Sequence, residues 1–182
     1  GASLGFGAGP STTSFGGRCL AEDLPLVLGL LAECLRQPTF PQEQMERLRS
    51  QILTSLSIRD QDTSERAEMA FDELLFPNHP FGIPSEGFPA TVSALSREDL
   101  VAFQRGYYSP GGMRVVIVGA VDARQTLEKV QNALGDWQPA AGEAPEQTWT
   151  PPQPLHETVR LHIPLEEKPQ TDLVMGCLGP RR

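Results

Sequence analysis

The chain has 182 residues, of which 39% are hydrophobic, 17 are glycine and 17 are proline. This composition is typical of an ordinary globular protein and not of a low-complexity chain, in which glycine and proline exceed about 25% of the residues. The formal net charge of −8 would repel the phosphates of a nucleic acid or of an anionic membrane surface. No apolar run reaches the about 20 residues that a membrane-spanning helix requires. We therefore expect no nucleic acid and no membrane as partners.

Three cysteines, Cys19, Cys34 and Cys177, lie far apart, with neither a C-x-x-C pair nor the spacing of a zinc finger. Unpaired cysteines are usually buried, so the sequence favours free, mostly buried thiols over a disulfide or a reactive thiol. An odd number of cysteines also fits a reducing compartment. We expect a cytoplasmic location.

The N-terminal segment predicts a β-hairpin followed by a buried helix. Apolar residues alternate at 4–8, a glycine-proline-serine turn follows at 9–11, and a second strand begins at 12–15. At 22–35 the apolar residues recur at intervals of three and four. This spacing predicts a helix that is buried on most sides.

A second helix is predicted to end near residue 60, and a third spans 64–75 with Thr63 as its candidate N-cap. The apolar stripe of the second helix consists of Met45, Leu48, Ile52 and Leu56. Its opposite face consists of Glu46, Arg47, Arg49, Ser50 and Ser57. We interpret that polar face as solvated.

The second half of the chain predicts two helices and a central strand. Ser96 and Asp99 have the spacing of a capping box and open a helix that ends near Tyr107. The continuous, β-branched run at 113–119 is typical of a strand buried on both faces. Asp122 is the candidate N-cap of a last helix, which ends at residue 135.

The predicted domain organisation has three parts. Residues 1–137 form most of one α+β domain, 138–154 form a proline-rich linker, and 155–182 contain the opening strands of a following, homologous domain. The first residue is not methionine, and the last apolar run, at 173–178, lies next to the C-terminus. We therefore expect the chain to be a piece of a longer protein.

The histidines do not predict a metal site. His156 and His162 are six residues apart in an alternating pattern, about 20 Å along a strand, whereas an H-E-x-x-H helix places two histidines four residues apart. His79 lies in a turn, where a hydrogen-bonded, structural histidine is more common than a general base. The glycine-rich run at 5–9 lies in the hairpin and lacks the strand-to-helix context of a phosphate-binding loop.

A series of short motifs is individually weak but occurs in a characteristic order. The motifs are LAEDLPL at 20–26, PTF at 38–40, FPNHPFG at 76–82, FQRGYYSPGGM at 103–113, VGAVD at 118–122, LGDW at 134–137 and KPQTD at 168–172. In this order and spacing the chain closely resembles the insulinase/pitrilysin family of zinc metallopeptidases, relatives of the mitochondrial processing peptidases. The resemblance covers nearly the whole chain.

The resemblance implies a metallopeptidase α/β roll, in which a mostly antiparallel sheet has helices packed on one face. Such domains repeat, so that two halves enclose a peptide-binding chamber. The catalytic half carries an inverted H-x-x-E-H helix, whose two histidines bind zinc, and a glutamate from a later helix completes the ligands. No H-x-x-E-H occurs in the 182 residues, and by the order of the motifs its place would be upstream of residue 1.

The later helix is present, and the position of the zinc-binding glutamate falls on Ser55, with Leu48 at a second position that is commonly acidic. A neutral hydroxyl cannot supply the anionic oxygen of a His/His/Glu site, so no catalytic residue and no metal ligand is expected here. Gly5 and Phe6 stand where the substrate-facing strand of catalytic members tends to carry Asn-Ala. They are the candidate peptide-facing strand.

We therefore predict an inactive, chamber-forming domain that packs on a homologous catalytic half, in the same or a partner chain, and helps to bind peptide substrates. Zinc would belong to the catalytic half and not to this fragment, and a homodimer is a further candidate assembly. One alternative is part of an active zinc endopeptidase, with the H-x-x-E-H upstream and Glu46 or Asp60 as substitute ligand. Another alternative is a purely structural subunit of a larger complex.

Overall fold

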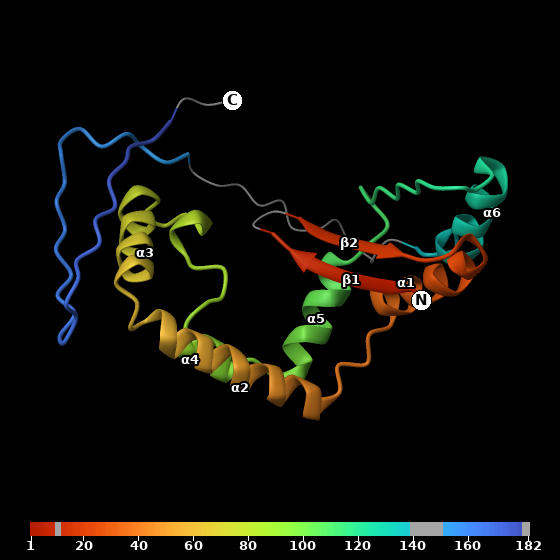
Figure 1. Cartoon of the computed structure of the whole chain (residues 1–182), viewed down its shortest axis with the longest axis horizontal. Helices are drawn as coiled ribbons and strands as arrows, with labels where there is room; N and C mark the ends of the chain where they lie inside the picture. Colours follow the sequence, from red (N-terminus) through yellow and green to blue (C-terminus); the bar gives the residue numbers. More distant parts are fainter. Residues whose placement is uncertain (10–11, 139–150, 180–182) are drawn as a thin grey trace. The chain divides into compact units, whose positions relative to one another are not determined.

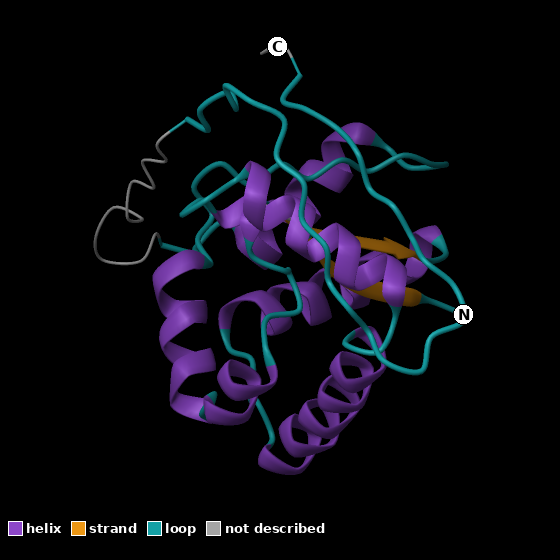
Figure 2. Cartoon of the chain, turned by 90° about the vertical axis from the view of Figure 1, so that its left-hand side faces the viewer, coloured by secondary structure: helices purple, strands orange, loops and turns teal. Residues whose placement is uncertain are grey.

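The computed structural model describes residues 1–9, 12–138 and 151–179, and helices dominate them (Figures 1 and 2). The chain divides into a first unit, residues 1–41 with 96–146, and a second unit, residues 42–95 with 147–182. Most of the predicted linker, at 139–150, lies outside the described residues. The predicted three-part division therefore stays a prediction.

The first unit begins with the predicted hairpin. Strand β1 (Ser3–Ala8) pairs antiparallel with β2 (Thr13–Arg18), and Phe6 stands opposite Phe15. The predicted turn includes residues 10 and 11, which lie outside the described residues. A small antiparallel sheet combined with helices confirms the α+β class.

Helix α1 (Leu24–Arg36) supplies most of the apolar core of the first unit, after a short 3-10 turn, η1 (Ala21–Asp23). Its apolar face packs on α6 (Ala123–Leu134). The buried apolar residues of these two helices are Leu24, Val27, Leu28, Leu31, Ala32, Leu35 and Leu134. The predicted helix at 22–35 is confirmed, but its predicted burial on most sides is wrong, because Leu26 and Leu30 are 61% and 46% exposed and only one stripe of the helix is buried.

Polar contacts at the end of α1 tie the first unit together. Arg36 forms a bidentate ion pair with Asp136, with N–O distances of 2.7 and 3.2 Å. Helix α5 (Arg97–Tyr107) approaches the same end, where the Gln104 amide donates to the Leu35 carbonyl at 2.8 Å. The last carbonyls of a helix have no partner within the helix, so Gln104 satisfies a group that α1 cannot satisfy itself.

The second unit contains α2 (Gln42–Arg59), α3 (Thr63–Leu75), a short 3-10 turn, η2 (Pro80–Gly82), and α4 (Pro89–Ala94). Neither η2 nor α4 was predicted from the sequence. The predicted N-cap of α3, Thr63, is wrong. Asp62, not Thr63, accepts the amide hydrogens of Ser64 and Glu65, because its carboxylate reaches both free N–H groups of the first turn.

The apolar stripe predicted for α2 is only partly buried. Leu56 is 1% exposed, whereas Leu48 is 55% exposed. In the described part of the second unit, α4 is the main neighbour of α2. Because α4 has only six residues, it can cover only part of an 18-residue helix.

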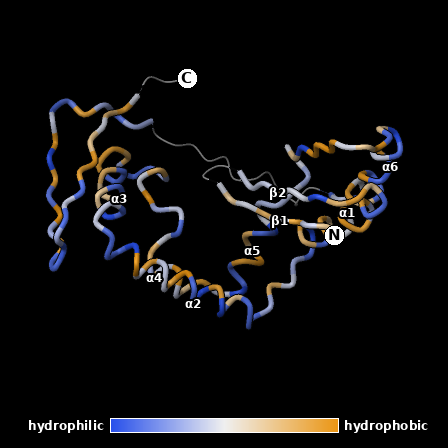
Figure 3. The backbone as a smooth tube through the Cα atoms, viewed as in Figure 1, coloured by the Kyte–Doolittle hydropathy of each residue, from blue (hydrophilic) through white to orange (hydrophobic). Residues whose placement is uncertain are grey.

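The strand predicted at 113–119 is wrong, because this segment carries no sheet ladder in the structure. The segment at 155–182, predicted to contain the opening strands of a following domain, carries no ladder in its described residues either, and that domain stays a prediction. Val116 and Val118 are 83% and 91% exposed, and their segment is the orange run before α6 in Figure 3. β-branched residues favour an extended backbone, but a strand also needs a hydrogen-bonding neighbour.

The structure also shows how far the three cysteines are exposed. The three cysteines are free, as predicted, but Cys34 and Cys177 are exposed and Cys19 is half-buried. The expectation of mostly buried thiols is therefore wrong, because Cys34 lies on the outer side of α1.

Among the described residues, no helix is long and apolar enough to cross a membrane.

The capping box of α5 predicts a pH dependence. The Ser96 N–H and hydroxyl donate to the Asp99 carboxylate at 2.8 and 2.7 Å, and these bonds hold the pKa of Asp99 below its ordinary value. A carboxyl whose pKa is lower in the folded than in the unfolded chain stabilises the fold above about pH 3.9, and this stabilisation is lost as the pH falls through the folded-state pKa. Asp99→Asn should therefore lower stability at pH 7 and reduce the loss between pH 5 and pH 2.

Urea unfolding followed by circular dichroism over this pH range measures the effect. Glu98→Gln removes the same charge one residue away, outside the capping box, and is the matched control. If the two variants gave the same pH profile, the capping box would have no part in acid unfolding.

Candidate functional site

The hairpin has one packed and one open face, because successive residues of a strand point to opposite sides. On one face a Cβ built on Gly17 would lie 3.6 Å from both the Leu4 and the Val27 side chains, so this face contacts α1. On the other face Gly5 stands opposite Gly16, and nothing lies within 4 Å of a Cβ built on either residue. The open face is thus nearly bare backbone.

The two residues predicted to face a peptide, Gly5 and Phe6, are both exposed in β1, and Phe6 is 47% exposed. As neighbours along a strand they point to opposite faces of the hairpin. Within the described residues the sheet has only two strands. The outer edges of β1 and β2 therefore offer backbone N–H and C=O groups to an added strand.

Ser55, the predicted vestigial ligand position, lies exposed on α2. It shares a helix face with Leu48, seven residues earlier, which is also exposed. The two positions at which the resemblance leads us to expect acidic residues are therefore both exposed on α2. Both carry neutral side chains.

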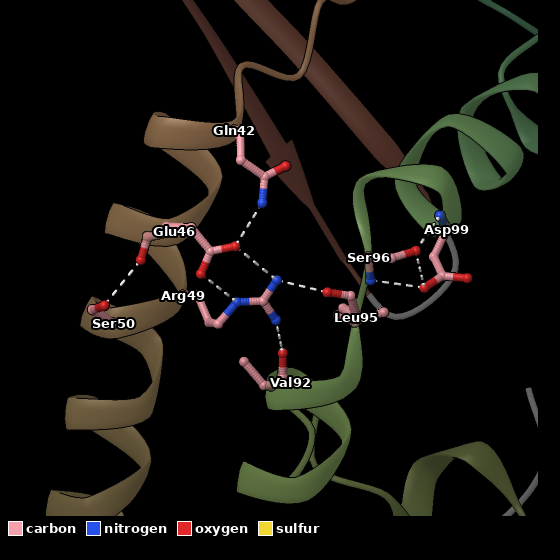
Figure 4. A network of polar contacts seen from close by, with 8 residues as sticks. All are labelled: Gln42, Glu46, Arg49, Ser50, Val92, Leu95, Ser96 and Asp99. Carbon is pink, nitrogen blue, oxygen red and sulfur yellow. Dashed lines mark hydrogen bonds and ion pairs between the residues drawn. The ribbon is translucent and has the colours of Figure 1, made fainter.

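Arg49 anchors α2, the helix that carries Ser55, to the segment containing α4 (Figure 4). Its guanidinium donates to the backbone carbonyls of Val92 and Leu95, the latter at 2.6 Å, and to the Glu46 carboxylate at 3.0 Å. The Arg49 side chain is only 15% exposed. The prediction that it belongs to a solvated face is wrong, because periodicity along α2 cannot reveal carbonyl acceptors more than 40 residues away.

The carboxylates considered as substitute ligands are engaged with arginines. Glu46 accepts from Gln42 at 2.8 Å and from Arg49, and Asp60 lies 3.4 Å from the Arg59 guanidinium. The described part of the chain contains no group of three or more His, Cys, Asp or Glu residues that could hold a metal ion. The side chains around Ser55 do not fit a zinc site.

The structure gives His79 a local structural role, as predicted. Its Nδ1 accepts the amide hydrogen of Phe81 at 3.1 Å, and its ring packs against those of Phe76 and Phe81, which also contact each other. His156 and His162 are exposed and lie outside any helix or strand. Among the described residues, none of these histidines belongs to a group of three or more side chains that could bind a metal ion.

Comparison with known proteins identifies the class. Residues 94–182 match the family model described as the peptidase M16 inactive domain. This segment is similar to that family, and the predicted resemblance of the chain to insulinase-type zinc metallopeptidases, in their non-catalytic half, is confirmed.

Two relatives illustrate the range of the family. The chain is 26% identical to an uncharacterized zinc protease of Mycobacterium bovis over 93% of this chain and 39% of that protein. It is 29% identical to subunit 1 of the mitochondrial cytochrome b-c1 complex of Mus musculus over 64% of this chain and 24% of that protein. Relatives thus include a protein named as a protease and one named as a subunit of a complex.

A solved structure confirms the fold. The crystal structure of a peptidase M16 inactive domain from Pseudomonas fluorescens matches 84% of this chain and 37% of that chain, with a TM-score of 0.74 and 22% identity. At this level of identity the match concerns the fold alone. The chain spans at most 39% of the length of these three proteins.

The Arg49 anchor predicts a stability effect. Arg49→Met should lower the free energy of unfolding by about 1.5–3 kcal/mol, because it removes charge-assisted hydrogen bonds and leaves two carbonyls without their donor. Arg47→Met is the matched control, since Arg47 is exposed on the same helix. Urea titration compares the two variants, and equal effects would contradict the anchoring role.

Proposed function

We propose that this chain is part of the non-catalytic half of a zinc peptidase, that it packs on a catalytic half, and that it contributes a surface of the peptide chamber. The observation that carries the proposal is the match of residues 94–182 to the inactive domain of the peptidase M16 family. Zinc would be bound by the catalytic half. In this proposal the present chain contributes shape and backbone contacts, and no catalytic group.

Ser55 supports the non-catalytic assignment. In the resemblance drawn from the sequence, this position corresponds to the zinc-binding glutamate, and here it is an exposed hydroxyl. A divalent zinc ion needs ligands that are anionic or basic, such as thiolate, imidazole and carboxylate. The exposed position also means that the side chain is free of any packing role that would account for its identity.

The hairpin supports the peptide-binding part of the proposal. An extended peptide can add to the edge of a sheet through main-chain hydrogen bonds, with no requirement for particular side chains. Beside such an edge, the glycine pair Gly5 and Gly16 leaves room for a second backbone to approach closely. The net charge of −8 would favour basic or neutral peptides.

A purely structural subunit is the second candidate. The relative that favours it is subunit 1 of the mitochondrial cytochrome b-c1 complex, which is named for an assembly and not for proteolysis. Peptide binding distinguishes the two candidates, because only the chamber-forming role requires it. The active-enzyme alternative is less well supported, because Glu46 and Asp60 are already paired with Arg49 and Arg59.

Restoring the acidic residue tests the absence of catalysis. Ser55→Glu should change the free energy of unfolding by less than about 0.5 kcal/mol, because the position is exposed. With added zinc it should bind no stoichiometric metal and cleave no fluorogenic peptide, since no described histidines accompany it. Ser57→Glu, also exposed on α2, is the control. Zinc-dependent cleavage by Ser55→Glu alone would overturn the assignment.

Covering the open face of the hairpin tests peptide binding. Gly5→Leu should weaken binding of a fluorescein-labelled, lysine-containing extended peptide several-fold, because its side chain covers the bare backbone beside Gly16. The fold should remain, since nothing lies within 4 Å of the new Cβ. Gly29→Leu, at an equally open position on α1, is the matched control. Fluorescence anisotropy that shows the same affinity for both variants would count against the hairpin as the binding surface.

A further inference from the structure

A cavity of about 390 Å³ lies within residues 66–88 of the second unit. One wall is a face of α3 that includes Arg66 and Glu73, and the other walls come from the loop after α3, including Phe76, Ile83 and Phe88. Its volume falls in the range of small-molecule sites, about 300–1,000 Å³. Its walls combine aromatic and aliphatic surface with a single cation, Arg66.

The Arg66 side chain has no hydrogen-bond or ion-pair partner in the part of the chain that the structure describes. Its Nε is shielded from solvent and meets no hydrogen-bond acceptor. Glu73 lines the same cavity but forms no ion pair with Arg66 among the described residues. A shielded donor without an acceptor costs free energy, and such groups are rare in folded proteins.

The chemistry of the walls selects the class of ligand. A guanidinium binds a carboxylate through two parallel N–H···O bonds. The rings of Phe76 and Phe88 provide apolar surface for the group attached to that carboxylate. Glu73 and the net charge of −8 disfavour a multiply charged anion such as phosphate. Because Nε itself is covered, the proposed carboxylate accepts from the two terminal Nη groups of Arg66, which carry the remaining N–H donors of the guanidinium.

We propose that this cavity is a binding site for a carboxylate that carries an apolar group, with Arg66 as its anion partner and Phe76, Ile83 and Phe88 as its apolar walls. The site is separate from the proposed chamber function, because it involves neither the hairpin nor Ser55. A peptide can supply such a carboxylate either at its C-terminus or from an acidic side chain next to an apolar residue. The two sources share the chemistry that Arg66 recognises.

The test uses the 182-residue chain and amide signals in two-dimensional NMR. N-acetyl-L-phenylalanine should shift signals of residues 66–88 in a saturable way, whereas its uncharged amide should not. N-acetyl-aspartyl-phenylalaninamide, which has only a side-chain carboxylate, distinguishes the two sources, and binding of either acid supports the site. The proposal is overturned if neither acid binds, if acid and amide bind equally, or if the shifts fall outside 66–88.

Two variants locate the binding. Arg66→Gln should weaken the binding of N-acetyl-L-phenylalanine at least about tenfold, the loss expected for a charge-assisted contact. Ile83→Trp should block the cavity while Arg66 remains, and it is tolerated because Ile83 is 59% exposed. Arg47→Gln removes an exposed arginine from α2 and should leave the affinity unchanged. If Arg66→Gln and Ile83→Trp both bind as the parent chain does, Arg66 and this cavity are not the site.

Discussion

Each extended backbone segment must find a hydrogen-bonding neighbour for its N–H and C=O groups, and this requirement governs the described structure. The hairpin meets it internally, since β1 and β2 pair over six residues each. The apolar segments at 113–119 and 172–178 do not meet it with a sheet ladder. In the proposed account, the strands that complete them lie in the other parts of the peptidase.

In the second unit, side-chain contacts hold one of these segments in place without meeting this requirement. The segment at 172–178 lies along α3, where the Thr63 hydroxyl donates to the Asp172 carboxylate and Gly176 approaches the Phe71 ring. These are side-chain contacts and not a ladder. They hold an extended segment against a helix while its backbone groups remain available for strand addition.

The proposed division of labour follows from what each surface offers. Helix α2 presents Ser55 where the resemblance places a zinc-binding glutamate, so it offers no charge to a metal. The hairpin offers bare backbone at Gly5 and Gly16. In the proposed function, a chain with these two surfaces holds an extended peptide and leaves the chemistry to the catalytic half.

The sequence predicted those elements whose signals are local. The 3.6-residue period, together with caps at Ser96 and Asp122, located α1, α5 and α6 within two residues. Sequence alone could not predict which apolar runs pair as strands, because an extended run such as 113–119 has the same pattern with or without a neighbour. The roles of Arg49 and Arg66 could not be predicted from the sequence either. The role of Arg49 depends on backbone carbonyls far away in the sequence, and that of Arg66 depends on cavity walls formed by an irregular loop.

The most direct test of the non-catalytic assignment is reconstitution with an H-x-x-E-H-bearing half from the same organism. Peptidase activity and sedimentation are measured for each half alone and for the mixture. The account predicts that the 182-residue chain alone cleaves no peptide, that the two halves sediment as one complex, and that cleavage in the mixture is abolished by a zinc chelator. Chelator-sensitive cleavage by the 182-residue chain alone, or two halves that sediment separately, would contradict it.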